Sequence, residues 1–142
     1  MNDQIRTKAG FPTSAQYIQM REEAGWGSIS NETADLSLEG SLFGVCLFDG
    51  ETLIGFSRVV GDGVLYFYIA DVIVSPSHGG KGYGSLLMEA MMDYIRSHAQ
   101  TGATIAVLAA PGQEKFYERF DLTPCPNLLF GQGLSMVMGH KC

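Results

Sequence analysis

The sequence predicts an α/β fold of the α+β type with a mixed sheet, in which an antiparallel meander leads into a β-α-β-α-β segment. The chain has 142 residues, the length of one domain, so a single domain is expected over residues 1–142. Helical spacing in the N-terminal quarter gives way to strand-like runs between residues 42 and 74. A glycine-rich loop, an amphipathic helix and a short apolar strand follow, which predicts a parallel strand pair with a right-handed crossover.

The first helix is predicted from its capping signal. Residues 13–16 (T-S-A-Q) have the form of a capping box, and Gly25 is expected to end the helix. The side chains at helical spacing between them are Tyr17, Met20, Arg21 and Ala24. A second, weaker helical segment is expected over residues 31–38.

Three strands are predicted next. Residues 42–48 and 53–60 read as a hairpin around the turn Asp49-Gly50, and residues 61–63 (G-D-G) turn the chain into a third strand over 65–74. This third strand is apolar on both faces, as expected of a central strand. One face is predicted to carry Tyr66, Tyr68, Ala70 and Val72, and the other Phe67, Ile69 and Ile73.

The C-terminal half is predicted to alternate helices and strands. A helix after the loop should bury Leu86, Leu87, Ala90, Met91, Tyr94 and Ile95, with Glu89, Asp93 and Arg96 facing water. A short buried strand over 104–109, a short helix over 112–120 and a last strand over 134–138 complete the expected order.

Composition narrows the classes of function. The formal net charge of −6 without a basic stripe argues against a nucleic-acid partner. No apolar run has the length of a membrane span, and the polar start is unlike a signal peptide. The three cysteines (Cys46, Cys125, Cys142) are scattered without metal-ligand spacing, so we expect no metal and a reduced, cytoplasmic setting.

The loop between residues 74 and 85 is the strongest functional signal. Four glycines in six positions (Gly79, Gly80, Gly82, Gly84) leave backbone N–H groups accessible, and the following helix adds unpaired donors and the positive end of its dipole. Such a site suits a phosphate or pyrophosphate. It is not a Walker A loop, because Gly82 follows Lys81 where Ser or Thr is required. A dinucleotide fingerprint fails too, because its third glycine would fall on Leu87.

A family resemblance specifies the ligand. The segment Val74-Ser75-Pro76 followed by residues 79–84 (G-G-K-G-Y-G) resembles motif A of the GCN5-related N-acetyltransferase (GNAT) family, which reads Gln/Arg-x-x-Gly-x-Gly/Ala and wraps the pyrophosphate of acetyl-coenzyme A. The predicted element order is also that of the family. Residues 116–122 (F-Y-E-R-F-D-L) resemble the family's Phe-Tyr-x-x-x-Gly-Phe segment, and residues 23–27 with 55–63 resemble a small, single-domain bacterial subgroup.

The chain departs from the family pattern at three places. Gly79 stands where the family has Gln or Arg, Asp121-Leu122 replaces Gly-Phe, and Ala110 replaces a frequent Asn. The first departure removes a side chain near the pyrophosphate but leaves the backbone donors.

The resemblance implies an acetyl-CoA-dependent N-acetyltransferase, with a splayed central pair of parallel strands and acetyl-CoA as cosubstrate. The acetyl-CoA contacts that it implies come from the backbone of Val72, Ile73 and Val74 and from the loop residues Gly79, Gly80, Lys81, Gly82, Tyr83, Gly84 and Ser85. Tyr117 is the implied general acid, because a phenol with a pKa of about 10 stays protonated at neutral pH and can donate to the leaving thiolate. No general base stands out, and Asp71, Asp62 and Glu32 stay open.

Two further residues are candidates for the acceptor site. Trp26 follows the first helix, where the family walls its acceptor site, although a core position explains it equally well. Arg58 lies inside a strand and needs a partner, which is either an internal carboxylate such as Asp62 or Glu32, the favoured alternative, or an anionic group of the substrate.

The expected partner is a small-molecule primary amine, with no nucleic acid and no membrane, and the resemblance leaves a homodimer open. The alternative function is a catalytically silent acyl-CoA-binding module that acts as a sensor or supports a partner protein. The replacements at positions 79 and 121–122 favour this alternative slightly, whereas the intact Phe116-Tyr117 pair favours the enzyme.

Overall fold

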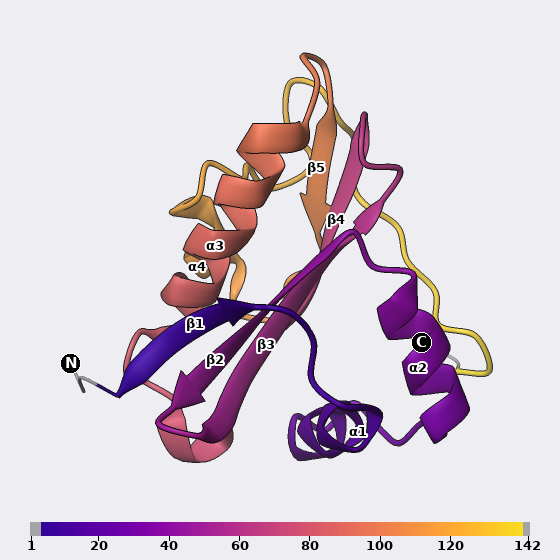
Figure 1. Ribbon diagram of the computed structural model, residues 1–142. Coiled ribbons are helices and arrows are strands. Elements are labelled where there is room, and N and C mark those ends of the chain that lie inside the picture. Colours follow the sequence, from indigo (N-terminus) through magenta and orange to yellow (C-terminus); the bar gives the residue numbers. More distant parts are fainter. Residues whose placement is uncertain (1–3, 141–142) are drawn as a thin grey trace. The chain divides into compact units, whose positions relative to one another are not determined.

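The computed structural model describes residues 4–140 (Figure 1). These residues belong to two compact units, the first extending to Leu108 and the second beginning at Ala109. A single domain over residues 1–142 stays a prediction. Within the described range, no helix combines the length and the apolar character needed to cross a membrane.

The first unit is a five-stranded mixed sheet with helices on both faces (Figure 1). The strands follow the order β1-β2-β3-β4-β5, antiparallel through β4, with β5 parallel to β4. Helix α3 packs on β2, β3 and β4, and α1 and α2 cover the other face. The elements are β1 (Ile5–Ala9), α1 (Ser14–Glu23), α2 (Asn31–Glu39), β2 (Phe43–Asp49), β3 (Thr52–Gly61), β4 (Tyr66–Val74), a 3₁₀ turn (Pro76–His78), α3 (Tyr83–His98) and β5 (Thr104–Val107). The mixed-sheet fold class, with its antiparallel meander and parallel pair, is confirmed.

Both N-terminal helices form where they are predicted. At the start of α1, the Gln16 N–H donates to Thr13 Oγ1 at 3.1 Å and the Thr13 N–H donates to Gln16 Oε1 at 2.9 Å, which completes the capping box. Ser30 caps α2 in the same way by accepting from the Thr33 N–H.

In α3, the exposure of Glu89, Asp93 and Arg96 is as predicted. Of its expected apolar stripe, Leu87, Met91 and Ile95 are buried, Leu86, Ala90 and Tyr94 are half-buried, and Met88 and Met92 are buried as well.

Strand β1 was not predicted. Its side chains are exposed after Ile5, and two of them, Arg6 and Lys8, are charged, so the segment has little apolar signal. It forms because its backbone pairs with β2, from Ile5 opposite Asp49 to Ala9 opposite Val45.

The predicted faces of β4 are wrong beyond residue 70. Arg58 pairs with Ala70 and Phe56 with Ile73, so two residues of β4, Asp71 and Val72, lie opposite Ser57. This β-bulge inverts the alternation of side chains that follows it. Ile73 therefore packs with Tyr17, Leu38, Cys46 and Phe56 beneath α1 and α2, whereas Phe67 and Ile69 are buried outside that cluster.

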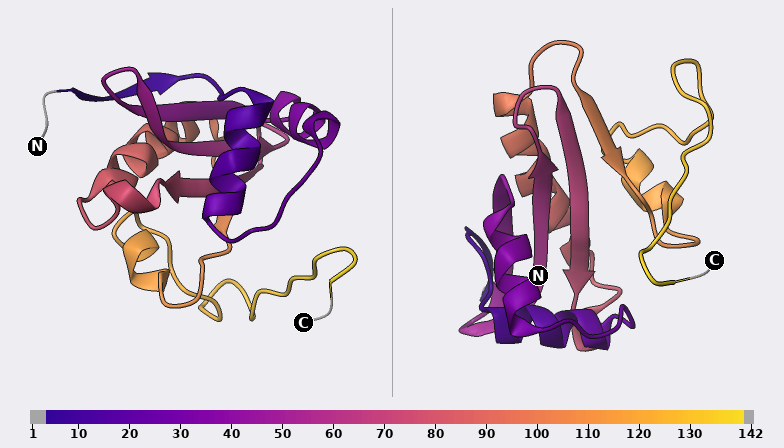
Figure 2. Two further views of the ribbon diagram at one scale, coloured as in Figure 1. Left: turned by 90° about the horizontal axis from the view of Figure 1, so that it is seen from below. Right: turned by 90° about the vertical axis from the view of Figure 1, so that its right-hand side faces the viewer.

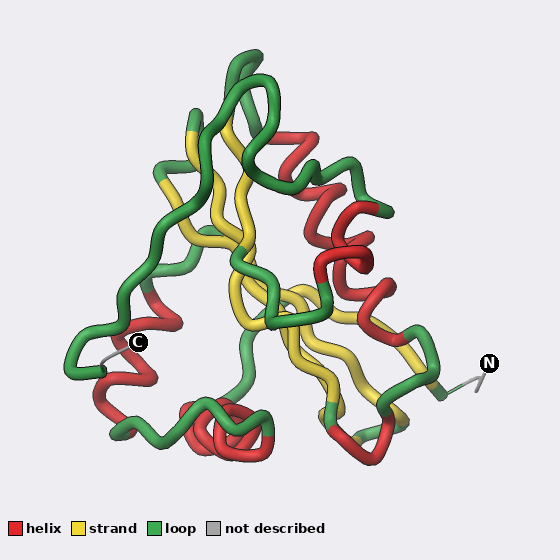
Figure 3. Tube along the Cα trace, turned by 180° about the vertical axis from the view of Figure 1, so that it is seen from behind, coloured by secondary structure: helices red, strands yellow, loops and turns green. Residues whose placement is uncertain are grey.

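The second unit contains one short helix, α4 (Glu114–Glu118), and is otherwise loop over its described residues (Figure 3). The last strand predicted over 134–138 is wrong: within residues 109–140 only an isolated bridge joins Val137 and His140. Leu134, Met136 and Met138 are exposed. Apolar alternation alone does not make a strand, because its backbone groups also need a partner.

Candidate functional site

The pairing between β4 and β5 stops halfway along β4. It runs from Tyr66 opposite Thr104 to Ile69 opposite Val107, and within the first unit β4 continues beside β3 alone (Figure 2). The Ser75 N–H donates to the Ile54 carbonyl at 2.7 Å, and the Ile73 carbonyl oxygen lies 3.0 Å from where a Cβ on Gly55 would be. Both groups therefore point toward β3.

The backbone groups of consecutive strand residues point to opposite sides. Those of Val72 and Val74 consequently face the side of β4 that β5 has left. Of the three strand residues predicted to meet the coenzyme arm, these two are oriented to offer backbone donors and acceptors. Ile73 is directed toward β3 instead.

The glycine loop follows directly from this open part of β4. Gly80 and Gly82 have φ angles of 74° and 80°, in the left-handed region that favours glycine. Apart from the adjacent residues, no atom of the described chain lies within 4 Å of a Cβ built on either glycine, so their main chain can be approached closely. Gly82 is also the N-cap of α3 and makes no side-chain cap, which leaves the first N–H groups of a 16-residue helix to other partners.

The other loop residues contribute in different ways. Lys81 is exposed, whereas the Tyr83 side chain is 8% exposed and belongs to the core. The Ser85 N–H already donates to the Gly82 carbonyl at 3.2 Å. The main-chain N–H groups of Tyr83 and Gly84, at the first two positions of α3, are the ones typically unpaired at a helix start.

Gly79 differs from its neighbours in conformation. Its φ of −68° and ψ of 160° are ordinary extended values, and a Cβ there would lie 3.5 Å from the Pro76 carbonyl, a normal contact. The backbone therefore does not require glycine at this position, and the Gln or Arg of the family motif fits it.

Arg58 has an internal carboxylate partner, as favoured, but the partner is Asp71 and neither Asp62 nor Glu32. Arg58 Nε donates to Asp71 Oδ2 at 2.7 Å, with the two side chains 11% and 9% exposed. Asp62 Oδ1 instead accepts three backbone N–H groups of the following turn, which lowers the pKa of Asp62. Glu32 is exposed in the first turn of α2.

The remaining donors of Arg58 reach the end of α2. Nη1 donates to the Ser37 carbonyl and to Ser41 Oγ, both at 3.0 Å, and Nη2 donates to Ser37 Oγ at 3.1 Å. The guanidinium thus links α2 to the bulge of β4.

Asp71 is the centre of a buried polar network that sequence reasoning missed. The Tyr17 hydroxyl donates to Asp71 Oδ2, and Arg21 Nη1 lies 3.8 Å from Oδ1. Burial and the bond to Asp71 raise the pKa of Tyr17. Arg21 Nε is buried without a partner among the described residues. The pairing depends on the β-bulge, for which the residue pattern carries no signal.

Trp26 lies at the surface, so the predicted alternative of a core position is wrong. Its side chain is 41% exposed, and the Arg21 guanidinium lies 5.8 Å from its ring centre. The flanking Gly25 and Gly27, with φ angles of 80° and 81°, hold it on the loop between α1 and α2.

Tyr117 lies in α4 of the second unit, half-buried, with its ring edge-on to that of Phe116 at 5.0 Å. Asp121, where the family segment has glycine, adopts a φ of 69°. It therefore takes the left-handed conformation that glycine would favour.

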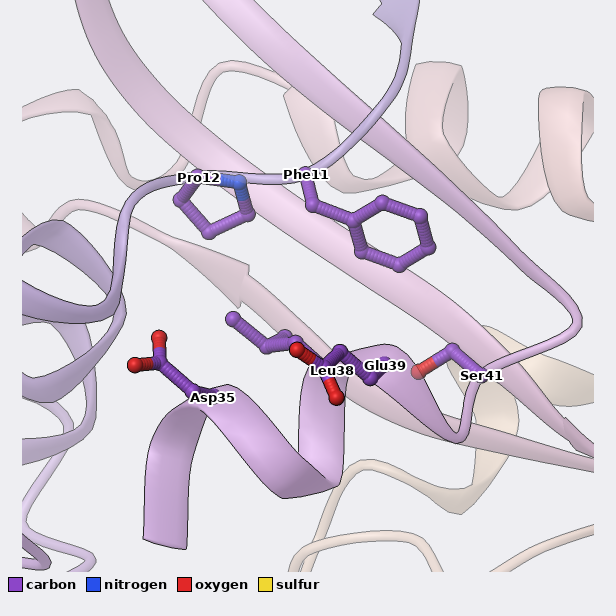
Figure 4. Close-up of a pocket in the computed structure, with 6 residues that line it drawn as sticks. All are labelled: Phe11, Pro12, Asp35, Leu38, Glu39 and Ser41. Atoms are coloured by element: carbon purple, nitrogen blue, oxygen red, sulfur yellow. The ribbon is translucent and has the colours of Figure 1, made fainter. Parts of the chain in front are cut away.

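A shallow groove of about 240 Å³ lies between the segment after β1 and helix α2 (Figure 4). Its lining residues are Phe11, Pro12, Asp35, Leu38, Glu39 and Ser41. None of the predicted coenzyme contacts lines it, so it is separate from the glycine loop. Among residues 4–140, no cluster of His, Cys, Asp and Glu side chains is arranged to hold a metal ion, and Cys142 lies outside that range.

Comparison with known proteins agrees with this geometry. The model of the acetyltransferase (GNAT) family matches residues 10–121. A rice (Oryza sativa subsp. japonica) protein, serotonin N-acetyltransferase 2, chloroplastic, is 32% identical over 78 residues. That match covers 55% of this chain but only 38% of the rice protein.

Solved structures share the fold. A protein of unknown function from meticillin-resistant Staphylococcus aureus, described as a probable acetyltransferase, is 32% identical with a TM-score of 0.82, covering 93% of this chain and 99% of that one. N-acetylglutamate synthase from Neisseria gonorrhoeae, solved with coenzyme A and L-arginine, is 19% identical with a TM-score of 0.63, covering 81% of this chain and 26% of that one. The glycine loop, the splayed strand pair and the family match over most of the sequence lead to one conclusion: the chain belongs to the acetyltransferase (GNAT) family.

Proposed function

We propose that this protein is an acetyl-CoA-dependent N-acetyltransferase that acts on a primary amine of a small molecule. The observation that carries the proposal is the continuity between the open part of β4 and the glycine loop. Among the described strands, only β3 lies beside Val72 and Val74, and their backbone leads within a few residues to two left-handed glycines and a helix start. These features suit, in that order, an extended amide-containing arm and a pyrophosphate.

The described residues fit acetyl-CoA. The open space at Gly80 and Gly82 admits a phosphate against the main chain, and the N–H groups of Tyr83 and Gly84, at the helix positions that usually lack an intrahelical partner, supply donors. Acetyl-CoA supplies the acetyl group as an activated thioester. The chain's part is to hold it, to donate a backbone N–H from Val72 or Val74 toward the carbonyl oxygen, and to exclude water.

Tyr117 is proposed as the proton donor to the departing thiolate. The support comes from its place in the Phe-Tyr segment of the family and from its chemistry, since a phenol is a protonated donor at neutral pH. Water takes the proton of the attacking amine. Asp71 is not assigned this role of general base, because its carboxylate already accepts hydrogen bonds from Arg58 and Tyr17.

A thiol-release assay with acetyl-CoA and a panel of primary amines tests the activity. Tyr117→Phe keeps the ring and should lower kcat roughly 10²-fold, with little change in acetyl-CoA affinity. The deficit should shrink at high pH, where the thiolate leaves without a proton. Equal kcat for the variant and the wild type at every pH would remove Tyr117 from the chemistry.

The second candidate is a silent acyl-CoA-binding module. Gly79 favours this alternative. A side chain would fit at this position, yet glycine offers none to bind the pyrophosphate. Acetyl-CoA binding without thiol release across the amine panel would establish this alternative. A cytoplasmic location, the absence of nucleic-acid or membrane partners and a homodimer stay predictions.

A further inference from the structure

Asp71 has an unusual backbone conformation immediately before the open part of β4. Its φ is 61°, in the left-handed region that non-glycine residues rarely adopt, and it is the first of the two residues that bulge opposite Ser57. Val72 follows directly. The direction of the Val72 backbone groups is therefore set by the dihedral angles of Asp71.

Three side chains from two elements, β3 and α1, anchor the side chain of Asp71. Arg58 of β3 donates to Oδ2 at 2.7 Å, Tyr17 of α1 donates to the same oxygen, and Arg21 of α1 lies 3.8 Å from Oδ1. The anchors are themselves held in place, since Arg58 is bonded to Ser37 and Ser41 and Tyr17 is 1% exposed. Hydrogen bonds from several partners restrict the conformations that a buried polar group can adopt.

The bulge and the network depend on each other. On a regular strand Asp71 would share the face of Phe67 and Ile69, among apolar side chains and away from Arg58. The extra residue places its carboxylate beside Arg58 and Tyr17. The ion pair in turn stabilises a backbone conformation that Asp71 would otherwise seldom adopt.

Resting on the acetyltransferase function proposed above, we infer that Asp71 is a positioning residue: its carboxylate, held by Arg58 and Tyr17, fixes the β4 bulge so that the Val72 backbone is aimed at the thioester carbonyl. This inference assigns Asp71 a role other than general base. Both of its oxygens face cationic or hydroxyl donors of the protein, and its side chain is 9% exposed.

Asp71→Asn tests the inference. Asparagine has the size of aspartate and tolerates the left-handed region, but it lacks the charge that holds the backbone of residue 71 in that conformation. The affinity for acetyl-CoA should change by less than about threefold, since the glycine loop carries the pyrophosphate. In wild-type protein, isotope-edited infrared spectroscopy should show the bound thioester carbonyl stretch below its free value. In Asp71→Asn the stretch should return toward the free value, and kcat should fall roughly 10²-fold for a misplaced donor.

Val45→Ala is the matched control for lost stability. Val45 is 1% exposed on β2 and touches no member of the network by hydrogen bond, so its truncation should lower Tm and leave the carbonyl stretch and the kcat of the folded protein unchanged. If the carbonyl stretch shifted equally in Val45→Ala and in Asp71→Asn, Asp71 would contribute to stability alone and would not position the Val72 backbone.

The outcomes separate the two proposals. Wild-type protein that binds no acetyl-CoA overturns the proposed function and this inference with it. Normal binding with an unaltered carbonyl stretch in Asp71→Asn overturns only the positioning role. Loss of the acidic limb of the kcat–pH profile in Asp71→Asn, with the stretch unaltered, would make Asp71 the general base instead.

Discussion

Removing the Arg58 side chain is the most informative perturbation of stability. Arg58→Met keeps the length and apolar stem of the side chain but leaves the Asp71 carboxylate with only Tyr17 and the more distant Arg21. The two charges of the original pair are 11% and 9% exposed, so solvent cannot replace the lost partner without rearrangement.

The expected magnitude follows from this burial. Breaking a buried ion pair by removing one partner costs about 3–5 kcal/mol, and the partners that remain place this site near the lower end, at about 3 kcal/mol. A chain of this size loses roughly 3 °C of Tm per kcal/mol, so the melting temperature should fall by about 9 °C. Acetyl-CoA affinity should not change, since the partners of Arg58 within residues 4–140 are Asp71, Ser37, Ser41 and Tyr17, none of which belongs to the glycine loop.

The assay is thermal unfolding by circular dichroism, with two companion variants. Arg58→Met combined with Asp71→Asn removes the uncompensated charge, so the double variant should recover more than about 1 kcal/mol relative to Arg58→Met alone. Arg6→Met breaks the exposed 3.9 Å pair with Glu51 and should change Tm little. A Tm for Arg58→Met within about 2 °C of wild type, or a double variant whose losses simply add, would refute the reasoning.

Three other predictions concern the loop and the buried tyrosine. Gly82→Val should abolish acetyl-CoA binding measured by calorimetry, whereas Gly102→Val, with an equally left-handed φ of 92° but away from the loop, should lose stability and keep binding. Gly79→Gln should tighten binding by about threefold to tenfold, the worth of one added hydrogen bond, because the position accepts a side chain; unchanged or weaker affinity would contradict that geometry. The pKa of Tyr17 is raised in the folded state, so its contribution to stability is complete below the unfolded pKa of about 10 and is lost as pH rises beyond it. The Tm of the wild type should therefore fall more steeply with pH than the Tm of Tyr17→Phe above pH ~10. Parallel plots of Tm against pH would show that the pKa of Tyr17 is the same in the folded and unfolded states.

Much of the fold could be predicted from local signals. The capping box at Thr13, the strand periods between residues 42 and 74, and the glycine loop before α3 all act over a few residues, so their consequences are fixed by the nearby chain. The same locality made the coenzyme loop recognisable. The left-handed φ angles of Gly80 and Gly82 are what a glycine-rich loop is expected to need.

Other features depended on partners distant in the sequence. Strand β1 has almost no buried side chains and exists through its pairing with β2, whereas residues 134–138 have an apolar alternation but form no strand. In both cases the decisive factor is whether backbone donors and acceptors find a partner, which side-chain pattern does not encode.

At the candidate site, the bulge at Asp71 likewise separates what the local sequence determines from what depends on distant partners. The sequence by itself determined that an arginine lies within a strand and needs a counter-charge, because an unpaired buried guanidinium is too costly. Which carboxylate meets it was decided by tertiary structure alone. One extra residue in β4, stabilised by contacts of Asp71 with α1 and β3, moves Asp71 to the face of Arg58 and sends Ile73 to the opposite face from Phe67. A register shift changes no residue, so it becomes visible only when the strands are paired.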